Sequence, residues 1–235
     1  MGRAIGTVAA RTGLPALVLA LHAVPAQAQI DKDTQVWTGA NANIVLNDHV
    51  EAGIEAITRF GNDNNGLYEA ELGVSLTWKV AGDIKLQLAY VQVPSYSEHV
   101  ITRREYRPRQ QIAFGDIATF WGGKLSGRMR IEERFVSTSD EMGVRLRPQI
   151  KFSLPFHSGK KTALVLYDES FLPLNTTDWG QKAGFDRMRN FIGISTPLSG
   201  RIDLELGYLN QYGFGTDGKP DTMDNVASFT LNFAF

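Results

Sequence analysis

The stretch Val144-Arg-Leu-Arg-Pro-Gln-Ile-Lys-Phe-Ser-Leu154 decides the fold, because the character of its side chains changes at every residue. The even positions from Val144 to Leu154 are apolar, and the odd positions from Arg145 to Ser153 are polar or charged. Successive side chains of a β-strand point to opposite faces of the sheet, so this pattern predicts a strand with one apolar and one charged face. Its eleven residues make it about twice as long as a typical globular strand of about 5–6 residues.

The same period of two recurs along most of the chain. Residues 68–80 alternate without a break, with Tyr68 and Leu72 on one face and Glu69 and Glu71 on the other. Most segments of this kind hold about ten or more residues, the length that a tilted strand needs to cross a membrane. None carries the apolar stripe of a helix. The expected strands lie near residues 34–46, 49–60, 67–80, 83–94, 103–114, 123–135, 142–154, 161–172, 185–197, 200–212 and 224–235.

The connections between these segments differ in character. Tight turns are expected at Asn47-Asp48, Ala81-Gly82 and Leu198-Ser199-Gly200. Longer polar loops are expected at Gly61–Gly66, Val136–Glu141, Pro173–Gly184 and Gly213–Met223, and Gly115–Gly122 is the least regular connection. Short turns that alternate with longer loops are typical of barrels in the outer membrane.

Strand length, alternation and connections together predict an all-β protein, a transmembrane antiparallel up-and-down β-barrel. The segments number eleven, whereas single-chain bacterial barrels normally have an even number of strands. Either the first segment starts inside the lumen, or one strand is missed or counted in excess. We therefore expect about 12 strands, with 10 as the alternative.

The last segment ends on an aromatic residue. Its apolar positions include Phe229, Leu231, Phe233 and the terminal Phe235. A C-terminal strand of this kind resembles the signal by which the outer-membrane assembly machinery recognises its substrates, so we expect these four residues to form that signal. The alternative interpretation is a core strand that happens to end the chain.

The first residues predict export. Arg3 and Arg11 accompany an apolar run from Leu14 to Val24 that is too short to span a bilayer, and Ala26 and Ala28 supply the small residues of a signal-peptidase site. We expect a signal peptide over residues 1–28 and the barrel over residues 29–235. The expected location is the outer membrane of a Gram-negative cell.

Composition narrows the classes of function. The 235 residues carry a formal net charge of −1 and no cysteine. A chain this close to neutral does not suggest a nucleic-acid partner, and the lack of cysteine excludes a disulfide scaffold and a thiolate metal site. His49, His99 and His157 remain after the expected cleavage, and the strand map places them too far apart to bind a metal together. We expect no metal and no cofactor.

An enzyme is the least favoured class. Ser95 and His99 offer a nucleophile and a base toward the outer rim, where lipid A hydrolases act. Both residues lie on one irregular segment, so we prefer the interpretation that they are polar side chains in contact with water, and an outer-membrane lipid hydrolase is kept as the less favoured alternative.

A series of short motifs runs along the chain in order: DTQVW at 33–37, YRPRQQ at 106–111, RIEERF at 130–135, RLRP at 145–148, FDRMRN at 185–190, LELGYLNQY at 204–212 and the terminal Phe235. The order of these motifs resembles the family of outer-membrane proteins catalogued as domain of unknown function 2490. The resemblance covers nearly the whole of residues 29–235, although each motif by itself is weak. It implies an outer-membrane barrel and supplies no activity.

Charged faces cannot lie against lipid, because Arg or Lys at mid-depth costs about 2–4 kcal/mol, so they are expected to line the lumen. The middle and late strands then form a basic wall, from Arg107, Arg109, Arg128, Arg130, Arg134, Arg145, Arg147, Lys151, Arg187 and Arg189. The first strands and the tenth form an acidic wall, from Glu51, Glu55, Glu69, Glu71, Asp203 and Glu205. Glu132 and Glu169 are embedded among the arginines.

Two functions fit such a lumen. In the first, the arginines draw a small anionic solute through a narrow channel, because rings of charged side chains set pore selectivity. In the second, the two walls pair across the lumen and close it, giving a structural barrel of the envelope. The sequence leaves both open, and in either case we expect a monomer whose partners are outer-membrane lipids and the assembly machinery.

Overall fold

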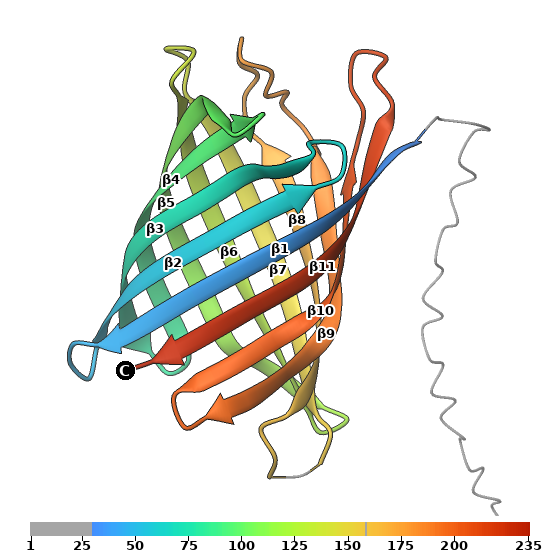
Figure 1. Cartoon of the computed structure of the whole chain (residues 1–235). Helices are drawn as coiled ribbons and strands as arrows, with labels where there is room; N and C mark the ends of the chain where they lie inside the picture. Colours follow the sequence, from blue (N-terminus) through green and yellow to red (C-terminus); the bar gives the residue numbers. More distant parts are fainter. Residues whose placement is uncertain (1–29, 158) are drawn as a thin grey trace, which may run out of the picture.

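Eleven β-strands close into one barrel in a computed structural model that describes residues 30–157 and 159–235 (Figure 1). These residues contain no helix that is long and apolar enough to cross a membrane. The expected leader 1–28, with Ala26 and Ala28, lies outside the described residues. The strands are β1 (Ile30–Val45), β2 (Val50–Gly61), β3 (Gly66–Ala81), β4 (Ile84–Ser97), β5 (Val100–Phe120), β6 (Gly123–Val136), β7 (Gly143–Pro155), β8 (Ala163–Pro173), β9 (Arg187–Ser199), β10 (Ile202–Gly213) and β11 (Asp221–Ala234).

The expectation of 12 or 10 strands is wrong, and the way the barrel closes explains why. Each strand pairs antiparallel with its neighbour in the chain, but β1 pairs with β11 in parallel, from Ile30 opposite Asp221 to Asn43 opposite Ala234. A closed ring of strictly alternating strands must have an even number. One parallel pair removes that requirement, so the eleven segments read from the sequence are the eleven strands.

The two ends of the barrel differ. At the end that we call the turn end, two-residue connections follow β3, β5 and β9, although seven residues join β7 to β8. At the opposite end, the loop end, thirteen residues join β8 to β9 and seven join β10 to β11, but only two join β4 to β5. Because the closing pair is parallel, β1 begins at the loop end and β11 finishes at the turn end (Figure 1).

The irregular connection expected at Gly115–Gly122 is mostly strand. β5 continues to Phe120, and the turn to β6 consists of Trp121 and Gly122, both with positive φ. The pairing of β5 with β6 shifts register between Phe114 and Ala118. This bulge breaks the alternation of side chains, which is why the sequence pattern stopped at residue 114.

Alternation places apolar side chains outside and polar ones inside, the reverse of a soluble barrel. Leu72 and Leu88 are more than half exposed on the outer surface, whereas Glu71 and Glu132 are buried on the inner one. Tyr68 departs from the expected pattern. A register shift between β2 and β3 leaves it as an extra residue of β3, and its hydroxyl contacts Gln35 and Trp37 inside the barrel.

Candidate functional site in the barrel lumen

The charged side chains singled out from the sequence lie on the inner face of their strands. Most of the arginines on β5, β6 and β7 are buried, and so is Glu71. Glu51 lies at the turn end, where it pairs with Lys79 at 3.1 Å and Lys85 at 3.0 Å, and Arg187 lies at the loop end beside Asp186. The structure brings most of the remaining predicted residues together in the half of the lumen nearer the loop end.

Glu132 is the centre of this cluster. It projects from β6 and is fully buried, with no exposed surface. Its carboxylate accepts hydrogen bonds from Arg145 Nη2 and Arg147 Nη1, each at 2.6 Å, and Arg109 Nε lies 2.9 Å away. Charge-assisted bonds to forked guanidinium groups are the strongest ion pairs that proteins form. Three arginines from two other strands therefore converge on one carboxylate.

The two walls meet across the lumen. Arg109 of β5 donates through Nη1 to Glu55 of β2 at 2.5 Å and through Nη2 to Glu71 of β3 at 2.9 Å. Arg59 of β2 pairs with Glu69 and, through Nη2 at 2.5 Å, with Glu71. The acidic strands are thus in direct contact with the arginine strands through side chains that are mostly buried.

Glu169 of β8 forms a second junction. Its oxygens accept from Arg128 Nη2 and Arg147 Nη2, both at 2.8 Å, and Arg189 Nη1 lies 3.9 Å away. Because Arg147 binds Glu132 through its other terminal nitrogen, the two buried carboxylates are linked through one guanidinium. The result is a continuous network from β2 to β9.

The network extends to the loop end through Glu105 of β5. Its carboxylate accepts from Arg107 Nε at 2.6 Å and Arg134 Nε at 2.5 Å. Arg134 also donates to Gln181, from the loop between β8 and β9, at 2.9 Å, and its guanidinium lies 4.8 Å from the centre of the Trp179 ring. The base of the longest loop is therefore fastened to the charged network.

Gly143 at the start of β7 makes room for that loop. A Cβ atom on Gly143 would lie 2.6 Å from the Trp179 ring and 2.8 Å from the side-chain amide of Gln181. Gln181 and Thr177 are almost completely buried. The loop thus covers the mouth of the lumen on the β6–β7 side.

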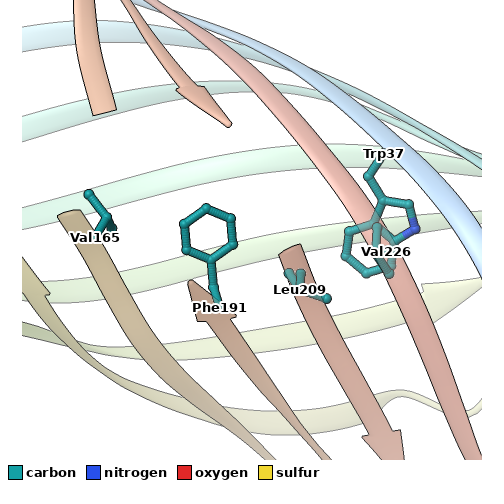
Figure 2. Close-up of a cluster of buried hydrophobic side chains, with 5 residues drawn as sticks. All are labelled: Trp37, Val165, Phe191, Leu209 and Val226. Atoms are coloured by element: carbon teal, nitrogen blue, oxygen red, sulfur yellow. The ribbon is translucent and has the colours of Figure 1, made fainter. Parts of the chain in front are cut away.

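The inner face of β8 to β11 and β1 also carries a cluster of apolar side chains. Trp37, Val165, Phe191, Leu209 and Val226 line up across these strands and point into the barrel (Figure 2). Guanidinium groups lie on their aromatic neighbours. Arg59 and Arg189 lie 4.3 and 4.7 Å from the Trp37 ring, and Arg147 and Arg189 lie 4.5 and 4.6 Å from Phe171. Cation–π contacts of this kind stabilise arginines in desolvated surroundings.

The lumen is open in the half nearer the turn end. One cavity of about 480 Å³ extends from the network, whose Arg109 and Glu169 line it, toward the turn end, and a second of about 280 Å³ adjoins it. Small or neutral polar side chains such as Ser195, Ser228 and Thr230 line the first, together with Asp203 and the Lys151–Glu205 pair at 3.0 Å. Arg128 and Arg130 line both cavities.

Sequence reasoning missed several members of the site. Arg59 and Glu105 share the inner face with Glu55 and Arg107, so the alternation of side chains would have identified them. Gln181 belongs to a loop without periodicity, and no signal in the sequence marks it. In the described part of the chain, no group of three or more His, Asp or Glu side chains could hold a metal ion.

Two comparisons relate the chain to known sequences. The profile of the family described as Protein of unknown function (DUF2490) matches residues 34–223. An uncharacterized protein of Methylorubrum extorquens (strain AM1) is 33% identical over 219 residues, which cover 93% of this chain and 95% of that protein.

Proposed function

The chain belongs to the DUF2490 family of proteins of unknown function, and from that premise we propose that it is a monomeric outer-membrane β-barrel whose lumen is closed by ion pairs. It serves as a structural barrel of the envelope, without catalytic activity. The single observation that carries the closed lumen is the burial of Glu132 among Arg109, Arg145 and Arg147.

The outer surface supports a place in the membrane. Outward side chains such as Leu72, Val74, Ile150 and Ile192 are about half or more exposed. In water such a surface would drive aggregation, because soluble monomers rarely expose large contiguous apolar patches. Contact with lipid would cover these apolar side chains. The short turns then face the periplasm and the long loops face outward, as in other barrels of this type.

The pairing and burial of the charged side chains support a closed lumen. A conducting pore needs charged groups that contact water, so that an ion exchanges its hydration shell for them and leaves again. Here Glu132, Glu105 and Glu169 are each at most 2% exposed, and each pairs with at least two arginines. The fixed charges neutralise one another and fill the cross-section nearer the loop end.

The competing function is the narrow anion channel, and conductance in planar bilayers separates the two. We expect the folded wild-type barrel to show no steady conductance above that of the bare bilayer. A triple variant that replaces Glu132, Arg145 and Arg147 by Ser removes both the carboxylate and two of its partners. We expect this variant to conduct, because the three substitutions remove bulk from the closed layer. The remaining carboxylates of the network stay paired with other arginines.

The triple variant is also the control for insertion, since its conductance shows that a barrel with the same outer surface enters the bilayer. Heat-modifiable migration on gels checks that both proteins are folded. Stable, anion-selective single-channel currents from the wild-type protein would overturn the closed lumen and favour the channel. Recovery of the protein in the soluble periplasm would overturn the place in the membrane.

A further inference from the structure

Arg130 is a buried arginine of the lumen without a close carboxylate. Its Nε donates to Gln111 Oε1 at 3.0 Å, and among the described residues the nearest acidic oxygen is Glu132 Oε1, 4.0 Å from Nη1. By contrast, Arg128, Arg145 and Arg147 each have a carboxylate oxygen within 2.8 Å. The side chain of Arg130 is 9% exposed.

The neighbours of Arg130 add positive charge. Arg147 lies directly opposite it on β7, and Arg128 lies two residues away on the same face of β6. In the described part of the chain Arg189 also has no carboxylate within 3.5 Å, but the rings of Trp37 and Phe171 cover it. A buried cation without a partner has lost its hydration and gained no ion pair in exchange, so the site favours a bound negative charge.

The space around Arg130 is suited to a ligand. Arg130 and Arg128 stand where the two cavities adjoin, and the larger cavity has the volume of a small-molecule pocket, since these hold about 300–1,000 Å³. Its lining carries seven cationic and five acidic side chains, and Glu69 and Glu132 pair with three of the lining arginines from behind. The attraction for an anion is therefore local to Arg130, which has no close carboxylate among the described residues. The second cavity adds neutral hydrogen-bonding groups from Asn43, Gln87 and Gln111.

We propose that this turn-end chamber binds a small organic anion, with its carboxylate or phosphate group held by Arg130 and Arg128. Forked guanidinium groups bind planar carboxylates and phosphates in pairs of hydrogen bonds. Hydroxyl groups on the rest of the ligand meet the side chains of Asn41, Asn232 and Gln111. Because the network closes the other end of the lumen, the ligand enters and leaves through the turn end.

The test measures binding to the purified, folded barrel in zwitterionic detergent by isothermal titration calorimetry. The probes are glucuronate, glucose 6-phosphate and uncharged glucose. We expect one or both anions to bind at least about tenfold more tightly than glucose, because charge-assisted hydrogen bonds are worth more than neutral ones. The two anionic probes distinguish a carboxylate ligand from a phosphate ligand.

Two substitutions test the role of the Arg130 guanidinium in different ways. Arg130→Gln removes the charge, and Gln111→Glu gives Arg130 a carboxylate of its own. We expect each to weaken anion binding by about tenfold or more while the barrel stays folded, because neither leaves a new charge unpaired. Arg201→Gln, at an exposed turn outside both cavities, is the matched control and should bind as the wild type does.

Heat-modifiable migration and circular dichroism verify that each variant is folded. Equal binding of anions by the wild type, Arg130→Gln and Gln111→Glu would overturn the proposal, as would equal affinity for glucose and the two anions. The binding measurement needs neither a bilayer nor a current. Its failure would therefore leave the closed lumen untouched, and conductance by the wild type would leave the anion site untouched.

Discussion

The side-chain amide of Asn41 on β1 donates a hydrogen bond of 3.0 Å to the side-chain carbonyl of Asn232 on β11, inside the barrel and across its parallel seam. The two residues face each other in the register that joins the first strand to the last. The backbone of Phe235 extends the seam, because it donates to Asn43 O and accepts from Val45 N, both at 2.9 Å. A barrel of eleven strands closes through these contacts.

In the proposed outer-membrane barrel, the parallel seam predicts that the start of β1 and the end of β11 lie on opposite sides of the membrane. The chain has no cysteine, so single-cysteine variants report position without background. In intact cells we expect a membrane-impermeant maleimide to label Asp31→Cys, at the start of β1, and Thr216→Cys, in a loop at the loop end. Asp48→Cys, at the turn end, should be labelled only after the membrane is opened.

The decisive comparison is between Asp31→Cys and Ala234→Cys, at the end of β11. A barrel with 10 or 12 antiparallel strands has both ends of the chain on one side, so labelling of Ala234→Cys in intact cells together with Asp31→Cys would contradict the parallel closure. We expect Ala234→Cys to behave as Asp48→Cys does. Thr216→Cys serves as the positive control for access from outside.

Glu132→Gln should destabilise the barrel strongly. The substitution leaves Arg145 and Arg147 without the carboxylate that both share, and removing one partner of a buried ion pair typically costs about 3–5 kcal/mol. Urea-dependent unfolding in lipid vesicles measures the loss. Glu133→Gln, the next residue on the opposite face of β6, is the matched control, and a similar loss in both variants would argue against the role of the network.

Asp168→Leu should stabilise the barrel if β8 faces lipid. Asp168 lies on the outer face, opposite Asn190 on β9, and its Oδ2 has no hydrogen-bond partner within the part of the chain that is described. Removing an acidic group from lipid should raise the free energy of unfolding by about 1–2 kcal/mol, less than for Arg or Lys. The measurement is unfolding in vesicles, with Asp48→Leu at an exposed turn as the control. Destabilisation by Asp168→Leu would show that the carboxylate has a required partner.

Phe235→Ser should reduce the amount of folded protein in cells while the purified chain still folds in detergent. The substitution removes the terminal aromatic ring of the expected assembly signal and leaves the backbone hydrogen bonds to Asn43 and Val45 in place. The folded fraction is measured by heat-modifiable migration of membrane extracts, and Phe235→Tyr should retain it. An equal loss of folding in detergent would assign Phe235 to stability rather than assembly.

The local pattern predicted the strands well and their closure poorly. The alternation in residues 144–154 placed Arg145, Arg147 and Lys151 on one face, which is the inner face of β7. It failed at Tyr68 and at Gly115–Phe120, where bulges add residues to a strand and exchange its two faces. The sequence shows eleven alternating segments, which is the correct number of strands. The expectation of 12 or 10 strands came from the rule that bacterial barrels have an even number.

The sequence by itself determined that the chain forms long strands with one apolar and one charged face, because alternation is a property of each strand alone. Only the tertiary structure decided which charges meet. Glu132 could pair with any of ten cationic side chains predicted for the lumen, and it binds Arg145, Arg147 and Arg109. Arg130, two residues away, has no close carboxylate among residues 30–157 and 159–235. Distances between side chains on different strands depend on register, tilt and the parallel closure of β1 on β11, and no single strand contains that information.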